Sequence, residues 1–240
     1  MLRRTCDRLR AMDGCSVAGL VPFSTIDFPD RLSAVVFMQG CPWHCQYCHN
    51  RHLQKAGVGA PGLQWSDVLR VLDARRGLLD AVVFSGGEPT GQSGLATACE
   101  DVRERGFEVG LHTGGAFPER LAQVLPLVDW VALDVKAPFE EYQRTTGIAE
   151  SGEAACESLA LVVGSGVAFE VRTTVHSALL SAESLDTLAR ELPGYGVQRW
   201  VLQPFRALGA GEEIGISSYT EEDLMHLTAA FDGERHVRIG

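Results

Sequence analysis

Short apolar runs recur along this chain, separated by more polar segments. The runs are rich in valine and aromatic residues, and such runs are typical of strands that are buried on both faces. They are LSAVVFM (32–38), AVVFS (81–85), FEVGLH (107–112), WVALDV (130–135), VAFEVRTTV (167–175) and RWVLQPF (199–205). The pattern predicts a strand over each of these ranges.

The segments between these runs have apolar residues at helical spacing. Their inward positions are Val68, Leu69 and Leu72; Leu95, Cys99 and Val102; Cys156, Leu159, Ala160 and Val163; Leu185, Leu188, Ala189 and Leu192; and Leu224, Leu227 and Phe231. We expect Ser66 to cap the first helix, Gly106 to stop the second, and Thr220 with Asp223 to open the last. Cys99 and Cys156 are then expected to be buried structural thiols.

Strand and helix patterns alternate, which is typical of βα units and a parallel sheet. No composition shift or long polar linker divides the chain, so residues 16–240 are predicted to form one domain and residues 1–15 a flexible tail. An open sheet with helices on both faces and a partial barrel both fit the pattern. In both architectures, ligands bind at the carboxyl ends of the strands.

Polar residues with possible ligand roles follow several predicted strands at their carboxyl ends. They are Cys41; Gly86, Gly87 and Glu88; Thr113; Asp134 and Lys136; Arg172 and His176; and Gln203 and Arg206. Because these ends meet at one edge of a parallel sheet, we expect a binding site there. His176 by itself is typical of a satisfied surface histidine.

Charge and hydropathy exclude some classes of partner. The 240 residues are 45% hydrophobic and carry a formal net charge of -10, which disfavours binding to a phosphate backbone. No apolar run approaches the length of a membrane span, and no apolar stretch follows the basic start MLRRTCDRLR as it would in a secretory signal. We therefore expect a cytoplasmic protein with no nucleic acid or membrane partner.

Three of the seven cysteines crowd into the loop GCPWHCQYCHN (40–50). In a reducing cytoplasm they stay thiols and can bind soft metals. A zinc site needs a fourth ligand, such as His44 or His49, whereas a c-type haem or a redox pair on Cys45 and Cys48 leaves Cys41 unused. A [4Fe–4S] cluster on three thiolates leaves one iron open for a substrate, because four cysteines close such a cluster. A fourth cluster ligand from the predicted tail, Cys6 or Cys15, stays open at this point.

The spacing Cys41-x3-Cys45-x2-Cys48, with Tyr47 before the third cysteine, resembles the signature of the radical S-adenosylmethionine superfamily. The segment SGGEPT (85–90) resembles the Gly-Gly-Glu-Pro motif of that superfamily. TIDFP (25–29) and the cysteine loop are together similar to the glycyl-radical-enzyme activating proteins, above all to that of anaerobic ribonucleoside-triphosphate reductase. The similarity runs from about residue 19 to residue 206 and implies a partial (βα)6 TIM-like barrel with outer helices.

This resemblance implies an activity and a set of contacts. A [4Fe–4S] cluster on Cys41, Cys45 and Cys48 would cleave S-adenosylmethionine (SAM), and the resulting radical would take a hydrogen atom from a glycine of a partner enzyme. The partner that the resemblance implies is an anaerobic ribonucleotide reductase. Flavodoxin or ferredoxin would supply the electron. The resemblance also implies the SAM contacts. Backbone groups of Gly86, Gly87 and Glu88 would bind the methionine ammonium, and the backbone of Tyr47 would bind the adenine. Asp134 and Lys136 would contact the carboxylate and ribose, Arg172 would pair with a carboxylate, and Thr113 is a further contact.

Other interpretations stay open at this point. Asp134 and Lys136 could instead be an exposed pair that caps a strand, and Arg172 could form a structural salt bridge. His112 stands where the pyruvate formate-lyase branch has the aspartate of a cation site, and Arg206 stands where that branch has histidine. A radical SAM enzyme acting on a small molecule, such as a deazaguanine synthase, and a zinc-stabilised non-catalytic module are the alternative functions.

Overall fold

The computed structural model describes residues 14–55, 63–206, 215, 217 and 219–238. The chain separates into two compact units. The first comprises residues 1–42, 52–113 and 119–131, and the second comprises residues 43–51, 114–118 and 132–240. Almost all of the predicted tail, including Cys6, lies outside the described residues, and the predicted single domain stays a prediction.

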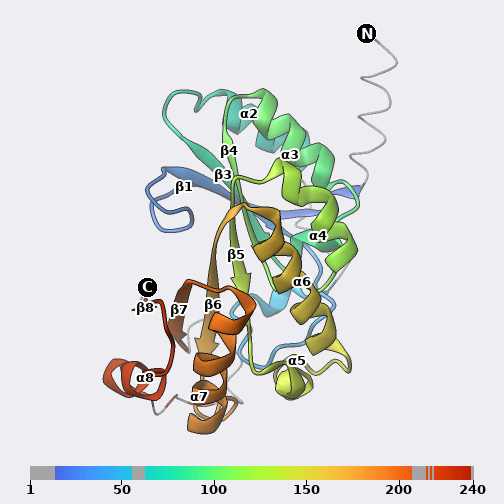
Figure 1. Cartoon of the computed structure of the whole chain (residues 1–240). Helices are drawn as coiled ribbons and strands as arrows, with labels where there is room; N and C mark the ends of the chain where they lie inside the picture. The colour runs from blue at the N-terminus through green and yellow to red at the C-terminus, as the bar shows by residue number, and fades with distance from the viewer. Residues whose placement is uncertain (1–13, 56–62, 207–214, 216, 218, 239–240) are drawn as a thin grey trace. The chain divides into compact units, whose positions relative to one another are not determined.

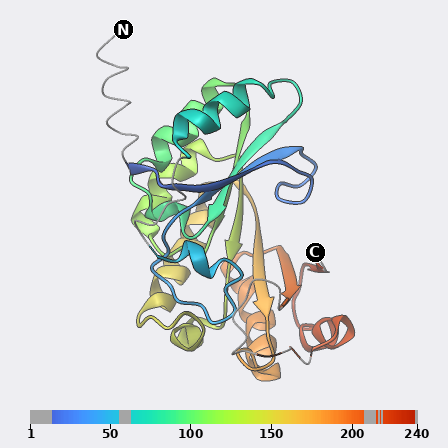
Figure 2. The same ribbon diagram turned by 180° about the vertical axis from the view of Figure 1, so that it is seen from behind.

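The first unit is built on four strands (Figures 1 and 2). β1 (Val17–Ser24) pairs antiparallel with β2 (Ser33–Met38), and β3 (Ala81–Gly86) and β4 (Glu108–Thr113) follow in parallel. The helices are α2 (Trp65–Asp73), α3 (Leu95–Glu104) and α4 (Pro118–Val124), with 3-10 turns η2 (Arg51–Leu53), η3 (Pro89–Gly91) and η4 (Leu125–Leu127). Both views show α2 and α3 side by side.

The second unit continues the parallel pattern. β5 (Trp130–Asp134) begins in the first unit and ends in the second, and β6 (Ala168–Val175), β7 (Arg199–Pro204) and β8 (Glu234–Val237) are parallel to one another. The helices are α5 (Tyr142–Thr146), α6 (Ser151–Ser165), α7 (Ala182–Glu191) and α8 (Glu221–Leu227), with 3-10 turns η5 (Phe139–Glu141) and η6 (Leu192–Tyr195). Strand order follows chain order, β1 to β8.

The predicted α/β architecture is confirmed. All six predicted strands are present as β2 to β7, because their valine-rich runs are buried on both faces; Val36, Val82 and Val109, for example, are fully inaccessible to solvent. The sheet is mostly parallel, and β1 and β8 are its edges. Most of the polar candidate residues therefore lie at the carboxyl ends of strands, as the sequence predicted, whereas Arg172 lies within β6.

Three local predictions were wrong. α2 begins at Trp65 after Gln64, whose N–H donates to Asp67 Oδ2 at 2.9 Å, so Ser66 is not the cap. α8 ends at Leu227, short of Phe231. The buried face of α6 is Ala155, Ser158, Leu159 and Val162, not the face that carries Cys156.

The shift of α6 has a packing cause. Ser158 Oγ donates to the carbonyl of Gly115 at 2.8 Å, so the small side chains of the helix face this glycine segment. Cys156 is left half-buried, with its sulfur 3.9 Å from Tyr195 Oη. Cys99, in contrast, is fully buried as predicted.

Candidate functional site

In the first unit, the segment after β3 is bound to the start of the cysteine loop through backbone groups. The N–H of Gly87 donates to Met38 O at 2.9 Å, and the N–H of Glu88 donates to Gly40 O at 2.8 Å. A Cβ on Gly87 would lie 2.3 Å from Gly40 O, so only glycine permits this approach. The Gly-Gly-Glu segment therefore fixes the backbone that leads into Cys41.

The side chain of Glu88 holds the ends of two strands together. Its Oε1 accepts hydrogen bonds from Thr90 N at 3.1 Å, Thr90 Oγ1 at 2.7 Å and Thr113 Oγ1 at 2.6 Å. All three residues are at most 3% exposed. Oε1 of Glu88 is thus occupied by donors of the first unit, and the SAM contacts of Glu88 and Thr113 stay predictions.

In the second unit, buried and exposed side chains alternate along the first part of the remaining cysteine loop. Trp43, Cys45 and Tyr47 are each less than 9% exposed, and the N–H of Cys48 turns back to Cys45 O at 3.1 Å. Among the described residues, no three His, Cys, Asp or Glu side chains form a group that could hold a metal ion. The cluster-ligand role of Cys41, Cys45 and Cys48 therefore stays a prediction from their spacing.

Lys136 is a cation that lies next to the cysteine loop in the second unit. Its Nζ lies 2.9 Å from Asp134 Oδ2 and over the rings of Trp43 and Tyr47, at 5.7 and 5.9 Å from their centroids. Burial alone would lower the pKa of Lys136, but the negative charge of Asp134 together with the neighbouring Tyr47 and Cys45 outweighs this effect, so the pKa is raised. Lys136 thus remains an ammonium ion, and the sequence alternative of an exposed pair is wrong for Lys136, which is 8% exposed.

Close packing locks Lys136 to the cysteine loop. A Cβ on Gly114 would lie 2.6 Å from the Trp43 ring and 3.3 Å from Lys136 Cε. Behind them, the N–H of Lys136 donates to Tyr142 Oη at 2.9 Å, and the Tyr142 ring meets the Trp43 ring edge-on. Trp43 and Tyr142 were not predicted as site residues. The sequence offers one indication of the packing of Trp43 against Lys136, which is the position of Trp43 inside the cysteine loop.

The hydroxyl of Tyr47 is a buried polar atom to which the described residues offer no hydrogen bond. The side chain is 6% exposed, and burial raises its pKa, against the opposing charge of Lys136. A buried hydroxyl without a partner costs free energy, so it is an observation that favours a bound ligand at this point. The charge of Lys136 also opposes the effect of burial on Cys45, whose pKa is raised.

Arg172 belongs to an ion cluster on β6. Its Nε donates to Glu170 Oε1 at 2.7 Å, and Arg199 and Arg238 approach the same carboxylate at 3.3 and 3.1 Å. Glu170 is 1% exposed, so this is a buried carboxylate surrounded by three guanidinium groups. The sequence alternative of a structural salt bridge is thus realised for Arg172, while its SAM contact stays a prediction.

A second aromatic group lies at the ends of β6 and β7. His176 is 1% exposed, so its predicted surface position is wrong, although its ring is satisfied: Nδ1 accepts from Ala178 N at 3.1 Å. Phe205 stacks on His49 and meets His176 edge-on. His49 Nε2 is 2.8 Å from Arg206 O, which ties the cysteine loop to the end of β7.

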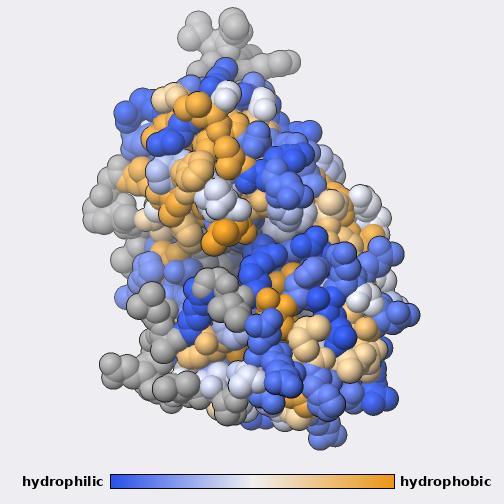
Figure 3. Space-filling view, turned by 90° about the vertical axis from the view of Figure 1, so that its left-hand side faces the viewer, coloured by the Kyte–Doolittle hydropathy of each residue, from blue (hydrophilic) through white to orange (hydrophobic). Residues whose placement is uncertain are grey.

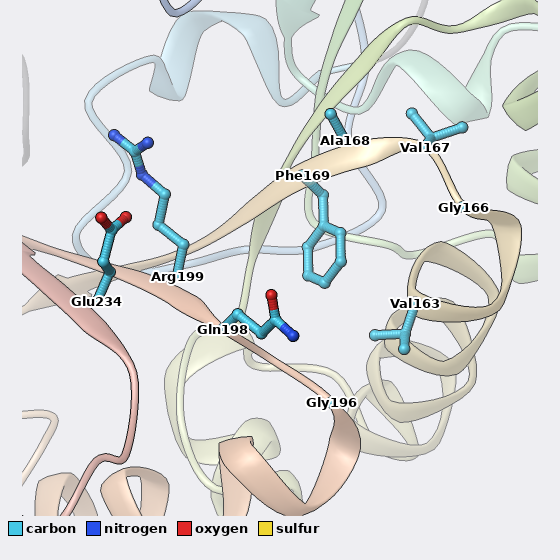
Figure 4. A pocket seen from close by; sticks show the side chains of 9 residues that line it. All are labelled: Val163, Gly166, Val167, Ala168, Phe169, Gly196, Gln198, Arg199 and Glu234. Carbon is cyan, nitrogen blue, oxygen red and sulfur yellow. The ribbon is translucent and has the colours of Figure 1, made fainter.

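Figure 4 shows a pocket of about 640 Å³ in the second unit. It is lined by residues at the amino ends of β6, β7 and β8, among them Ala168, Arg199 and Glu234. In parallel α/β folds the chemistry lies at the carboxyl ends of the strands. This pocket is therefore not the candidate active site.

The donor set fits an iron–sulfur cluster. Three thiols stand within eight residues, and thiolates are the ligands that such clusters require. In the second unit, the ammonium group of Lys136 lies over the ring of Tyr47, whose buried hydroxyl has no hydrogen-bond partner among the described residues. Separately, none of the described helices has both the length and the apolar character that crossing a bilayer requires.

Comparison with known proteins gives consistent matches. The sequence profile of the radical SAM superfamily matches residues 35–192. A protein of Methanocaldococcus jannaschii that is provisionally named a glycyl-radical enzyme activating enzyme is 31% identical over 194 residues, 77% of this chain and 79% of that protein. The pyruvate formate-lyase-activating enzyme of Streptococcus mutans is 28% identical over 231 residues, with 87% and 86% covered.

Two further matches each cover about half of the matched protein. The 7-carboxy-7-deazaguanine synthase of Thermococcus kodakarensis is 29% identical over 125 residues, 44% of this chain and 49% of that enzyme. The crystal structure of Streptococcus suis SuiB bound to S-adenosylmethionine has a TM-score of 0.64 at 13% identity, over 83% of this chain. The present chain spans about half of that protein, 48%, so the likeness establishes the fold alone.

Proposed function

Since the chain belongs to the radical SAM superfamily, whose members carry a [4Fe–4S] cluster and use S-adenosylmethionine, we propose that it generates a glycyl radical on a partner enzyme. Three relatives that this chain matches over more than three quarters of their length are named activating enzymes. Membership in this superfamily of enzymes also argues against the alternative that the chain is a zinc-stabilised, non-catalytic module.

The observation that carries this proposal is the environment of Lys136. A buried ammonium group is held between Asp134, at the end of β5, and two aromatic rings of the cysteine loop. In our proposal Cys41, Cys45 and Cys48 hold the cluster, and Asp134 and Lys136 bind the carboxylate and ribose of SAM. Gly86, Gly87, Glu88, Tyr47, Thr113 and Arg172 complete the SAM contacts.

The residues of the chain then have distinct tasks. Cys41, Cys45 and Cys48 would hold the cluster, which when reduced would supply the electron that cleaves SAM, and the adenosyl product would take a hydrogen atom from a glycine Cα. Lys136 and Asp134 orient the ligand through opposite charges. Trp43 and Tyr142 keep water from Lys136, because both are buried against it.

For the partner, we propose an anaerobic ribonucleotide reductase, with flavodoxin or ferredoxin as the electron donor. The support is the motif similarity together with two departures from the pyruvate formate-lyase branch, at His112 and at Arg206. His112 stands in place of an aspartate, and its Nε2 lies 2.8 Å from the backbone carbonyl of Asp27. The histidine thereby contacts the TIDFP segment (25–29), and position 112 offers no carboxylate that could bind a cation.

The test is anaerobic incubation of the reconstituted protein with reductant, SAM and the candidate reductase. We expect a glycyl radical doublet in the electron paramagnetic resonance spectrum and an equal amount of 5′-deoxyadenosine. The alternative is a deazaguanine synthase, which the partial similarity to that enzyme favours. Formation of 5′-deoxyadenosine with consumption of a small molecule, and without a radical on any glycyl radical enzyme of the same cell, would replace the proposal by this alternative.

A further inference from the structure

Exposed large hydrophobic side chains are concentrated at one place in the first unit. Of the seven such side chains among the described residues, five belong to β1, to the segment that joins it to β2, or to the turn before β3. These five residues, which we call the β1 apolar surface, are Val21, Phe23, Ile26, Leu32 and Leu78. Figure 3 shows hydrophobic residues gathered in the upper part of the face on which Figure 1 places β1.

Pairing in the sheet brings these residues to the same end of the strands. Ser24 of β1 pairs with Ser33 of β2, and Ser33 pairs with Ala81 of β3, so Phe23, Leu32 and Leu78 all lie near this row. The N–H of Leu32 donates to Asp80 Oδ2 at 2.9 Å, which fixes the segments to each other. The surface is therefore built from paired strands and their ends.

The loop between β1 and β2 is anchored, so the exposure of Ile26 is enforced by its neighbours. Phe28 is buried, and its ring lies 5.3 Å from the ring of Trp130. The carbonyl of Asp27 lies 2.8 Å from His112 Nε2. With both following residues fixed inward, Ile26 is 70% exposed, and Phe23 on the strand is 52% exposed. Apolar groups that are held out in this way are typical of a protein interaction surface.

The charges around the surface indicate what kind of partner fits. Asp27, Asp30 and Asp80 border it, while Arg31 is already bound to Glu108 at 2.8 Å. A second copy of this chain, with net charge -10, would bring the same carboxylates face to face. Addition of a strand to the edge is also disfavoured, because Pro22 has no N–H to donate. A partner with apolar side chains and a basic rim fits.

From these observations we propose that the β1 apolar surface docks the glycyl radical enzyme, an inference that rests on the proposed function. The surface lies at the amino ends of β2 and β3, whereas Cys41 and the Gly-Gly-Glu segment follow their carboxyl ends. A strand of six residues spans about 20 Å, so a large enzyme can anchor on this surface and extend its glycine segment to the other end. An enzyme with a small-molecule substrate has no use for such an anchor.

The experiment uses the reconstituted holoenzyme and a Phe23→Ser/Ile26→Ser double variant. The rate of glycyl radical formation is measured against the concentration of the partner reductase. We expect the half-saturating concentration to rise about 10-fold or more, since truncating two apolar anchors removes on the order of 1.4 kcal/mol or more. The maximal rate and the cleavage of SAM without partner should not change. Met225→Ser, on α8 of the second unit and 37% exposed, is the matched control.

The outcomes separate the two proposals. If the wild-type protein forms no glycyl radical on any candidate enzyme, the proposed function fails and the docking proposal fails with it. If the wild type forms the radical and the folded, cluster-loaded double variant has an unchanged half-saturating concentration, only the docking proposal is overturned. Sedimentation velocity of the protein alone gives a further check, because a wild-type dimer that the double variant dissociates would identify a second copy as the occupant.

Discussion

Replacing Glu170 by glutamine tests whether the ion cluster on β6 stabilises the second unit. The carboxylate is 1% exposed and lies 2.7 Å from Arg172, 3.1 Å from Arg238 and 3.3 Å from Arg199. Removing one partner of a buried ion pair costs about 3–5 kcal/mol. Because the side chains of Arg199 and Arg238 are 40% and 31% exposed, water can solvate them, and we expect the lower end of this range for Glu170→Gln.

The pH dependence gives the prediction its sign. Burial alone would raise the pKa of Glu170, but the charges of Arg172 and Arg238 outweigh it, so the folded-state pKa lies below the ordinary value of 4.5. A depressed carboxyl pKa stabilises the fold fully above the unfolded-state pKa, and this contribution is lost as pH falls through the folded-state pKa. The wild type should therefore exceed Glu170→Gln in stability at pH 7 and lose that advantage below about pH 4.

The assay is thermal unfolding of the anaerobically purified protein at several pH values. A loss of about 3 kcal/mol lowers the melting temperature of a domain of this size by about 6–12 °C. Glu234→Gln is the control, because this glutamate of β8, which pairs with β7, has a side chain 67% exposed. A melting temperature of Glu170→Gln equal to that of the wild type at pH 7, or a deficit that persists undiminished at acid pH, would refute the reasoning.

Three further predictions address the site directly. Cys45→Ala should abolish the visible absorption of the cluster and SAM cleavage, whereas Cys99→Ala, fully buried in α3, should lower only the melting temperature; an intact cluster in Cys45→Ala contradicts this. Asp134→Ala should keep its iron but bind SAM about 10- to 150-fold more weakly in calorimetry, since a charge-assisted contact is worth about 1.5–3 kcal/mol; unchanged affinity leaves the pair a structural role. Tyr47→Phe should weaken SAM binding about 5-fold without loss of stability, because its hydroxyl has no partner among the described residues; lower stability with unchanged affinity would mean a structural hydrogen bond.

The strands that were predicted are those with two buried faces, and the strands that were missed are the edges. β1 contains Gly19 and Pro22 and leaves three consecutive residues exposed, so it has neither the alternation nor the apolar continuity of a strand. β8, with sequence ERHV, has a single apolar residue and is recognisable only through its pairing with β7. Apolar periodicity reports burial, and an edge strand offers too little of it.

The site could be predicted where its ligands are neighbours in sequence. The three cysteines and the Gly-Gly-Glu segment are short motifs, and Asp134 and Lys136 end a recognisable strand. What could not be predicted is the set of contacts between distant segments. The cation–π contact of Lys136 with Trp43 depends on tertiary packing, and nothing in the sequence around Glu170 distinguishes it from an outward-facing strand residue.

These contacts explain why the cysteine loop needs more than cysteines. Thiolates bind metal, and burial opposes ionisation of Cys45 by raising its pKa. The ammonium of Lys136 acts in the opposite direction, and Asp134 together with two aromatic faces keeps that ammonium charged and in place. A cation fixed beside a buried sulfur therefore stabilises negative charge on the loop. We propose this as a second role of Lys136, beside its proposed contact with SAM.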